Sequence, residues 1–321
     1  MAESASTSPQ TTPSEALFEN VIIGPSPLVR AVWLLRRAFV AAYEDNCFGI
    51  AKGAAYSFLL SLFPILTTLT SILIQVRAQA VVHVIATFLM QVVPPGTEEL
   101  ILSRLREKGG PSGSLPVVAV IVSLWAGSGA MMSLMEGFRA AYRIPTGRPF
   151  LKERGMGILL VLIAALPAVG ASSLIIMGDR GASAFIHWIG SPRVSEISTP
   201  VLMLWGIARY GVAFCTTAFV TGLLYYFGPN YVPEPPTIKG PPPSRFLRVW
   251  PGAFIATVLW LPATVGFAWY VAHIANYNFF YGSLGTVIIL LVWLYLTACI
   301  TLVGCEFNAE RDRIEAMPSL Y

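Results

Sequence analysis

The chain has 321 residues, of which 55% are hydrophobic and only 12% are charged, and its formal net charge is +4. A soluble domain carries about a quarter charged residues, so this composition, with a mean hydropathy of +0.66, excludes an ordinary soluble protein. It predicts an all-α, polytopic integral membrane protein. The small basic surplus fits contact with anionic lipid headgroups and gives no sign of nucleic-acid binding.

The N-terminal region is predicted to have two parts. Residues 1–25 are polar and acidic, lack the features of a signal peptide and are expected to be a disordered tail. Residues 26–50 are expected to form a basic amphipathic helix in the cytoplasmic interface, or a helix that packs on the bundle. Its apolar positions are Leu28, Val32, Leu35, Phe39 and Tyr43.

Six segments are apolar and long enough to cross about 30 Å of hydrocarbon as helices. They are residues 54–76, 115–135, 157–177, 201–227, 251–273 and 284–305, within a membrane domain of residues 51–310. Residues 80–93 are too short to cross, and we interpret them as a buried or interfacial helix, or as half of a re-entrant hairpin. Residues 311–321 are expected to be a short cytoplasmic tail.

Positive charges predict the orientation, because Lys and Arg are retained on the cytoplasmic side. Fourteen lie in the N-terminal region, between spans two and three, between spans four and five, and after span six, whereas six lie on the other side. Both termini are therefore predicted to be cytoplasmic.

Arg209 is the one ionisable residue well inside a predicted span. If span four begins at residue 201, Arg209 lies roughly 13 Å deep and needs a buried partner or a watery cavity. If the span begins at Tyr210, the side chain extends to the outer interface instead. Both readings stay open.

Two carboxylates, Glu136 and Glu306, close the second and sixth spans. A carboxylate at the C-terminal end of a helix opposes the helix dipole, so each is expected to need a basic partner. Arg139 is one candidate partner for Glu136. The pair either belongs to a gate or proton-linked site, or forms a structural layer of salt bridges.

Small hydroxyl residues and a proline lie in the first span. Ser57 and Ser61 share one helical face, and Pro64 frees a backbone carbonyl near the middle of the span. Pro167 and Pro262 lie in the third and fifth spans, so each outward-running helix carries an internal proline. Such features line a cavity or a hinge, but they also serve close helix packing.

Metal and nucleotide chemistry have no signature here. The three histidines lie in different segments, the four cysteines form no CxxC pair, and no phosphate-binding loop is present. We expect no metal, no cofactor and no disulfide.

Four sequence blocks resemble the YihY/BrkB family of bacterial inner-membrane proteins. They include AAYSFLLSLFPIL, YRIPTGRPFLKERG and LYYFGPN followed by PGAFIATVLW, and they end with the run from residue 279 to 310. The most specific parts are the entry to the last span, at Tyr281, Gly282, Ser283 and Gly285, and its exit, at Glu306, Asn308 and Glu310.

The resemblance implies a six-span protein of the bacterial inner membrane. Some members were once labelled ribonuclease BN, but this sequence has no water-exposed cluster of acids or histidines for such hydrolysis, so we expect no enzyme. Our leading hypothesis is a permease for a lipid or small solute, with Ser57, Ser61, Pro64, Glu136, Arg209, Glu306 and Asn308 as candidate cavity or gate residues. The alternative is a non-transporting scaffold for envelope proteins. Expected partners are the lipid bilayer and a second copy or an envelope protein, not a nucleic acid.

Overall fold

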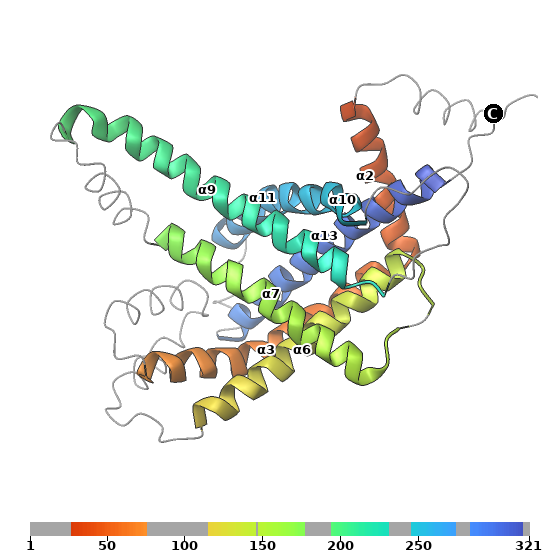
Figure 1. Ribbon diagram of the computed structural model, residues 1–321, viewed down its shortest axis with the longest axis horizontal. Coiled ribbons are helices and arrows are strands. Elements are labelled where there is room, and N and C mark those ends of the chain that lie inside the picture. Colours follow the sequence, from red (N-terminus) through yellow and green to blue (C-terminus); the bar gives the residue numbers. More distant parts are fainter. Residues whose placement is uncertain are drawn as a thin grey trace, which may run out of the picture.

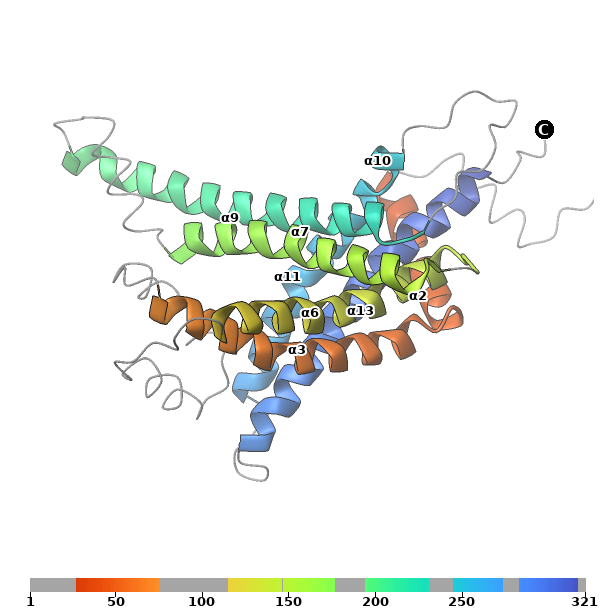
Figure 2. The ribbon, with the colours of Figure 1, turned by 60° about the horizontal axis from the view of Figure 1, so that its bottom comes forward.

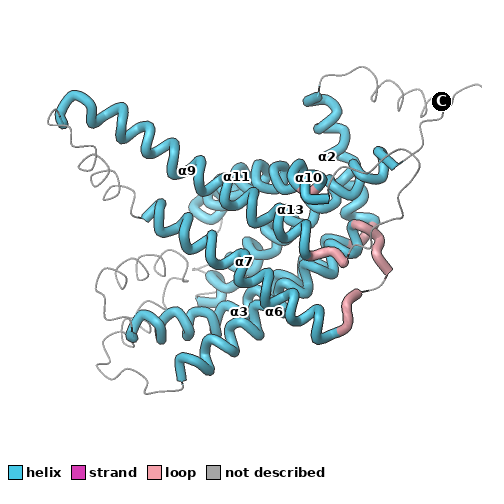
Figure 3. The backbone as a smooth tube through the Cα atoms, viewed as in Figure 1, coloured by secondary structure: helices cyan, strands magenta, loops and turns pink. Residues whose placement is uncertain are grey.

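The computed structural model describes residues 27–75, 115–145, 147–176, 194–230, 245–273 and 283–316. The predicted tail, the short segment 80–93, and Tyr281 and Gly282 lie outside these ranges. Within them every regular element is helical (Figure 3). The helices are α2 Pro27–Glu44, α3 Cys47–Gln75, α6 Leu115–Ala141, α7 Phe150–Ile176, α9 Val194–Phe227, α10 Arg245–Arg248, α11 Trp250–His273 and α13 Ser283–Ala316.

Six of the described helices are long and apolar enough to cross a membrane, namely α3, α6, α7, α9, α11 and α13. They cover the six predicted spans except for residues 76 and 177, which lie outside the described ranges. The prediction of a six-span helical membrane protein is confirmed. Several helices run beyond the predicted spans. The largest difference is in α13, which continues beyond its apolar stretch to Ala316.

A short break separates α2 from α3. Asn46 adopts a left-handed backbone with φ 56°, a conformation that asparagine tolerates better than most residues. Its carbonyl then accepts hydrogen bonds from the Gly49 and Ile50 amides, at 3.0 and 3.1 Å, which start α3. The predicted helical segment 26–50 is therefore two elements, and its last four residues belong to α3.

The six long helices pack in a ring (Figure 1). Going round it, α13 contacts α3, α3 contacts α6, α6 contacts α7, α7 contacts α9, α9 contacts α11, and α11 returns to α13. α13 also contacts α6 across the ring, and α2 packs on α13. The last helix therefore packs against four others, α2, α3, α6 and α11.

The two ends of this bundle differ. We call the charged end the one that holds α2, the starts of α3, α7 and α11, and the ends of α6, α9 and α13. The helices are close together there, whereas α7 and α9 diverge from α3 and α6 towards the opposite end (Figures 1 and 2). Buried residues gather at the charged end and include Ala51, Phe138, Tyr225, Ala253 and Leu302. Large apolar side chains nearer the opposite end are exposed, among them Ile121, Val169, Ile207 and Val265.

Candidate functional site

Glu306 lies at the centre of a group of charged side chains at the charged end. Its relative exposure is 0%. The Cys47 thiol donates a hydrogen bond to its Oε1 at 3.4 Å, and its Oε2 lies 3.8 Å from Nη1 of Arg313. Within the described part of the chain, Oε2 has no hydrogen-bond partner. A buried carboxyl normally satisfies its oxygens with several donors, so this one is poorly solvated.

Arg313 joins three parts of the chain. Its guanidinium pairs with Glu310 one turn earlier on α13 and donates to the backbone carbonyl of Ala141 at the end of α6. It also lies 3.5 Å from Asp45, in the turn between α2 and α3. One arginine thus fastens α13 to α6 and to the start of α3.

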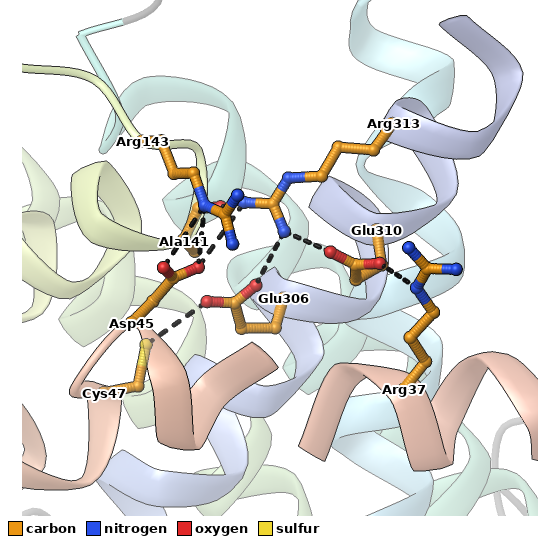
Figure 4. Close-up of polar contacts among 8 residues, drawn as sticks. All are labelled: Arg37, Asp45, Cys47, Ala141, Arg143, Glu306, Glu310 and Arg313. Carbon is orange, nitrogen blue, oxygen red and sulfur yellow. Dashed lines mark hydrogen bonds and ion pairs between the residues drawn. The ribbon is translucent and has the colours of Figure 1, made fainter. Parts of the chain in front are cut away.

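Two further arginines complete the charged cluster (Figure 4). Nε of Arg143 donates to Asp45 at 3.2 Å, and Nε of Arg37 donates to Glu310 at 2.5 Å. The cluster therefore sets three carboxyl groups against three guanidinium groups. We use the name charged cluster for Arg37, Asp45, Arg143, Glu306, Glu310 and Arg313.

Local backbone geometry explains how these residues meet. Glu306, Glu310 and Arg313 follow at spacings of four and three, so they share one face of α13. Arg143 has a left-handed backbone with φ 53° where α6 ends. The Ile144 amide there bonds back to the Arg139 carbonyl at 2.9 Å, as in a Schellman cap. That cap turns Arg143 towards Asp45.

Asn308, on the same helix, has a structural role. Its side-chain oxygen accepts a hydrogen bond from the Gly252 amide at 2.7 Å, and its amide donates to the Val249 carbonyl at 2.9 Å. The Gly252 amide belongs to the first turn of α11 and has no partner within the helix. Val249 lies just before α11, and its carbonyl also accepts a bond from the Ala253 amide at 3.2 Å. Asn308 therefore ties the start of α11 to α13, and the close approach needs Gly252, where a Cβ would collide with the Gly304 carbonyl.

A second ionic group holds the end of α9. Arg148, in the α6–α7 connection, donates to the carbonyls of Phe227 and Gly228 at 2.9 and 3.0 Å. Its neighbour Glu153 lies 3.8 Å away and pairs with Arg139. Burial lowers the pKa of Arg148 from its ordinary value, and the Glu153 carboxylate opposes that change. The Arg148 guanidinium therefore caps the C-terminal end of α9, where the helix dipole favours a positive charge.

The remaining predicted residues are dispersed. Glu136 is exposed, and its candidate partner Arg139 is paired with Glu153 instead. Arg209 is partly buried beside the Tyr210 ring, 5.1 Å from its centroid. It lies about 27 Å along α9 from the charged end, at 1.5 Å per residue. Neither residue is part of the charged cluster.

The hydroxyl face of α3 packs against α6. The Ser57 and Ser133 hydroxyls are 3.4 Å apart, and those of Thr68 and Ser123 are 2.5 Å apart. Ser61 is buried and donates to the Phe58 carbonyl of its own helix, and Pro64 lies inside the same helix three residues later. These hydroxyls act as helix-packing groups in this structure.

Sequence reasoning missed most of the cluster. It named Glu306 and Asn308 but assigned no role to Asp45, Cys47 or Arg313. Arg313 was expected in a short tail, and the break at Asn46 that positions Asp45 has no strong sequence signal.

Of the four entry residues of the last span, Ser283 begins α13 and Gly285 is buried. Among the described residues, no group of three His, Cys, Asp or Glu side chains is placed to hold a metal ion.

Comparison with known proteins identifies the family. The model of the Virulence factor BrkB family matches residues 38–319. The chain belongs to this family. It is 30% identical to the ribonuclease-like protein YfkH of Bacillus subtilis (strain 168), over 84% of this chain and 92% of that protein. No solved structure matches.

Longer relatives carry the name UPF0761 membrane protein. Those of Alkalilimnicola ehrlichii and Chlorobium chlorochromatii are 26% and 25% identical to this chain. The matches cover 83% and 84% of this chain but only 55% and 59% of those proteins. The chain thus spans a little over half of these two relatives and nearly all of YfkH.

Proposed function

We propose that this BrkB-family protein is a permease of the bacterial inner membrane for a lipid or a small amphipathic solute, and not an enzyme. In this proposal the charged end faces the cytoplasm, in agreement with the excess of Lys and Arg in the loops at that end. α2 then lies at the level of the cytoplasmic headgroups. The charged cluster acts as the cytoplasmic gate.

One observation carries the proposal, namely the contrast between the two ends of the bundle. The charged end is closed by buried ion pairs and close helix contacts, while α7 and α9 diverge from α3 and α6 towards the other end. A transporter that alternates its access needs one closed end and one open end. Internal prolines at Pro64, Pro167 and Pro262 give the three outward-running helices points at which to bend.

Purified protein in liposomes tests the proposal. We expect faster exchange of fluorescent lipids between leaflets, or uptake of an amphipathic solute, than in protein-free liposomes. Arg313→Gln, which removes the arginine shared by three carboxyls, is expected to change that rate by severalfold. A protein that moves neither lipids nor solutes under proton, sodium and voltage gradients would contradict the proposal.

A scaffold for envelope proteins is the second candidate function. The dispersal of Ser57, Glu136, Arg209 and Glu306 favours it, because these groups do not form one substrate site. The outer face of α2, with Val32 and Phe39 exposed, offers a surface for a partner. If the scaffold function holds, deletion of residues 78–114 should abolish co-purification of an envelope protein and leave liposome permeability unchanged.

A further inference from the structure

The carboxyl groups of the charged cluster are not equally compensated. Asp45 and Glu310 each contact a second arginine, Arg143 and Arg37 respectively, in addition to Arg313. Among the arginines that the structure describes, Glu306 contacts Arg313 alone, and at the longest distance, 3.8 Å. Arg313 is therefore divided among three acids, and Glu306 receives the smallest share.

The hydrogen bonds of Glu306 also leave its carboxyl group poorly compensated. An ionised carboxylate offers about four acceptor positions, yet Glu306 accepts one bond from a thiol, which is a weak donor, and its Oε2 accepts none. Burial of a carboxylate costs several kcal/mol unless donors and cations replace the lost water. The described surroundings suit a carboxyl that carries a proton better than one that is ionised.

The groups around Glu306 come from every neighbouring part of the site. Charges that act on it directly are those of Asp45, Glu310 and Arg313, and the Cys47 thiol touches it. Arg143 and Arg37 act through Asp45 and Glu310. With all three acids ionised, the cluster is neutral, and with Glu306 protonated it carries one positive charge. Neutrality of the whole cluster does not remove the desolvation of Glu306, whose relative exposure is 0%.

We propose that Glu306 is a proton-binding site whose occupancy keeps the charged end closed. When the proton is bound, the buried carboxyl is neutral and the packed arrangement is stable. When the proton leaves to water, the buried charge favours opening, because water can then solvate it. Low pH thus favours the closed end and high pH favours the open end. This inference rests on the proposed function only for its meaning in transport.

Cys47 provides a direct reporter of opening. Its thiol is buried, with 1% relative exposure, and touches Glu306. In a variant with Cys215→Ser, Cys299→Ser and Cys305→Ser, alkylation by a water-soluble maleimide measures how often water reaches Cys47. The rate is measured in nanodiscs between pH 5.5 and 8.5 and divided by the rate in denatured protein, which removes the ionisation of an ordinary thiol.

We expect this normalised rate to rise with pH, by up to about tenfold per pH unit for a single linked proton. Negative charge on Glu306 would slow formation of the thiolate, so a rise in the rate reports opening and not thiol chemistry. Glu306→Gln, a neutral stand-in for the protonated acid, is expected to remain protected throughout. Glu136→Gln makes the same change at an exposed carboxyl outside the charged cluster, so it is the matched control and should keep the rise with pH. A flat normalised rate in the unmodified Glu306 protein, or an equal rise in Glu306→Gln, would overturn the proposal.

Hydrogen exchange covers the case in which Glu306→Gln does not fold. In the protein with Glu306 intact, amides of residues 45–50 and 302–310 should be better protected at pH 6 than at pH 8, after correction for intrinsic exchange. Equal protection would refute the inference. Neither experiment requires transport, so a pH-dependent end in a protein that moves no solute would reject the proposed function and keep this inference. Solute transport with a pH-independent Cys47 would do the reverse.

Discussion

The two halves of α11 are packed in different ways. Near its start, Gly252 lies against the backbone of Gly304, and Asn308 of α13 bonds to its first turn. Fourteen residues later in the sequence, a Cβ at Gly266 would meet no described atom within 4 Å outside its own stretch of helix. Towards the opposite end α11 contacts α13 through aromatic rings, with Trp260 and Phe267 at 6.0 and 5.1 Å from the Trp293 ring. The same helix is therefore held by close backbone contacts at the charged end and by large side chains towards the opposite end.

Substitution of the two glycines gives the largest expected difference. Gly252→Ala forces a methyl group into the Gly304 carbonyl, and such overpacking against backbone is expected to destabilise the protein by about 3 kcal/mol. Gly266→Ala should be neutral or stabilise α11 by up to about 1 kcal/mol, because alanine favours helices. Thermal unfolding in detergent measures both. Equal losses of stability would show that the two halves are packed alike.

Asn308→Ala is expected to have the next largest effect. It leaves the buried Gly252 amide without its partner, at about 2 kcal/mol, while the Val249 carbonyl keeps its bond from the Ala253 amide. Thr264→Val is the control on the other half of α11, since that hydroxyl bonds only to the Trp260 carbonyl of its own helix. Its melting temperature should be close to that of the original protein. A small effect of Asn308→Ala would mean that water or another group takes over the bond from the Gly252 amide.

Two arginines of the α6–α7 connection are expected to differ in importance. Arg148→Gln removes a partly buried cation from the end of α9 and should cost about 1.5 kcal/mol. Arg143→Gln breaks an ion pair whose arginine side chain is 59% exposed, and exposed pairs contribute about 0 to 1 kcal/mol. Chemical denaturation in mixed micelles can rank them. The opposite ranking would indicate that the charged cluster, and not the cap on α9, determines stability at this end.

Ser57→Ala is expected to have the smallest effect on stability. Hydrogen bonds between membrane helices contribute about 0.6 kcal/mol on average, and the bond to Ser133 is long. Liposome assays give the sharper result. If the serine only packs α3 against α6, transport should be unchanged, whereas loss of transport with normal stability would place Ser57 on the solute pathway.

Hydropathy was sufficient to predict the six spans but not their full helices. It responds to the apolar part of a helix, so it ended the sixth span at residue 305, although α13 continues through Glu306, Glu310 and Arg313 to Ala316. The omitted turns hold three of the six residues of the charged cluster. Their helical spacing is visible in the sequence only after the helix is known to continue.

Glu136 and Glu306 show why the site itself could not be predicted. Both follow apolar spans at equivalent positions, and sequence alone treats them alike. In the structure Glu136 is exposed and Glu306 is fully buried. The difference comes from α2 and the start of α3, which cover α13 at this end. Such contacts join residues about 260 positions apart, and no local pattern records them.

The charged cluster also bears on how the protein is made. Its members come from residues 37–47, near 141–143 and from 306–313, so the early and late parts of the chain must meet before it exists. At about 5–20 residues per second, roughly 13–50 s of synthesis separate Cys47 from Glu306. During that interval Asp45 and Cys47 have no acid or arginine of α13 to contact. The charged cluster therefore cannot close this end before the last helix has been made.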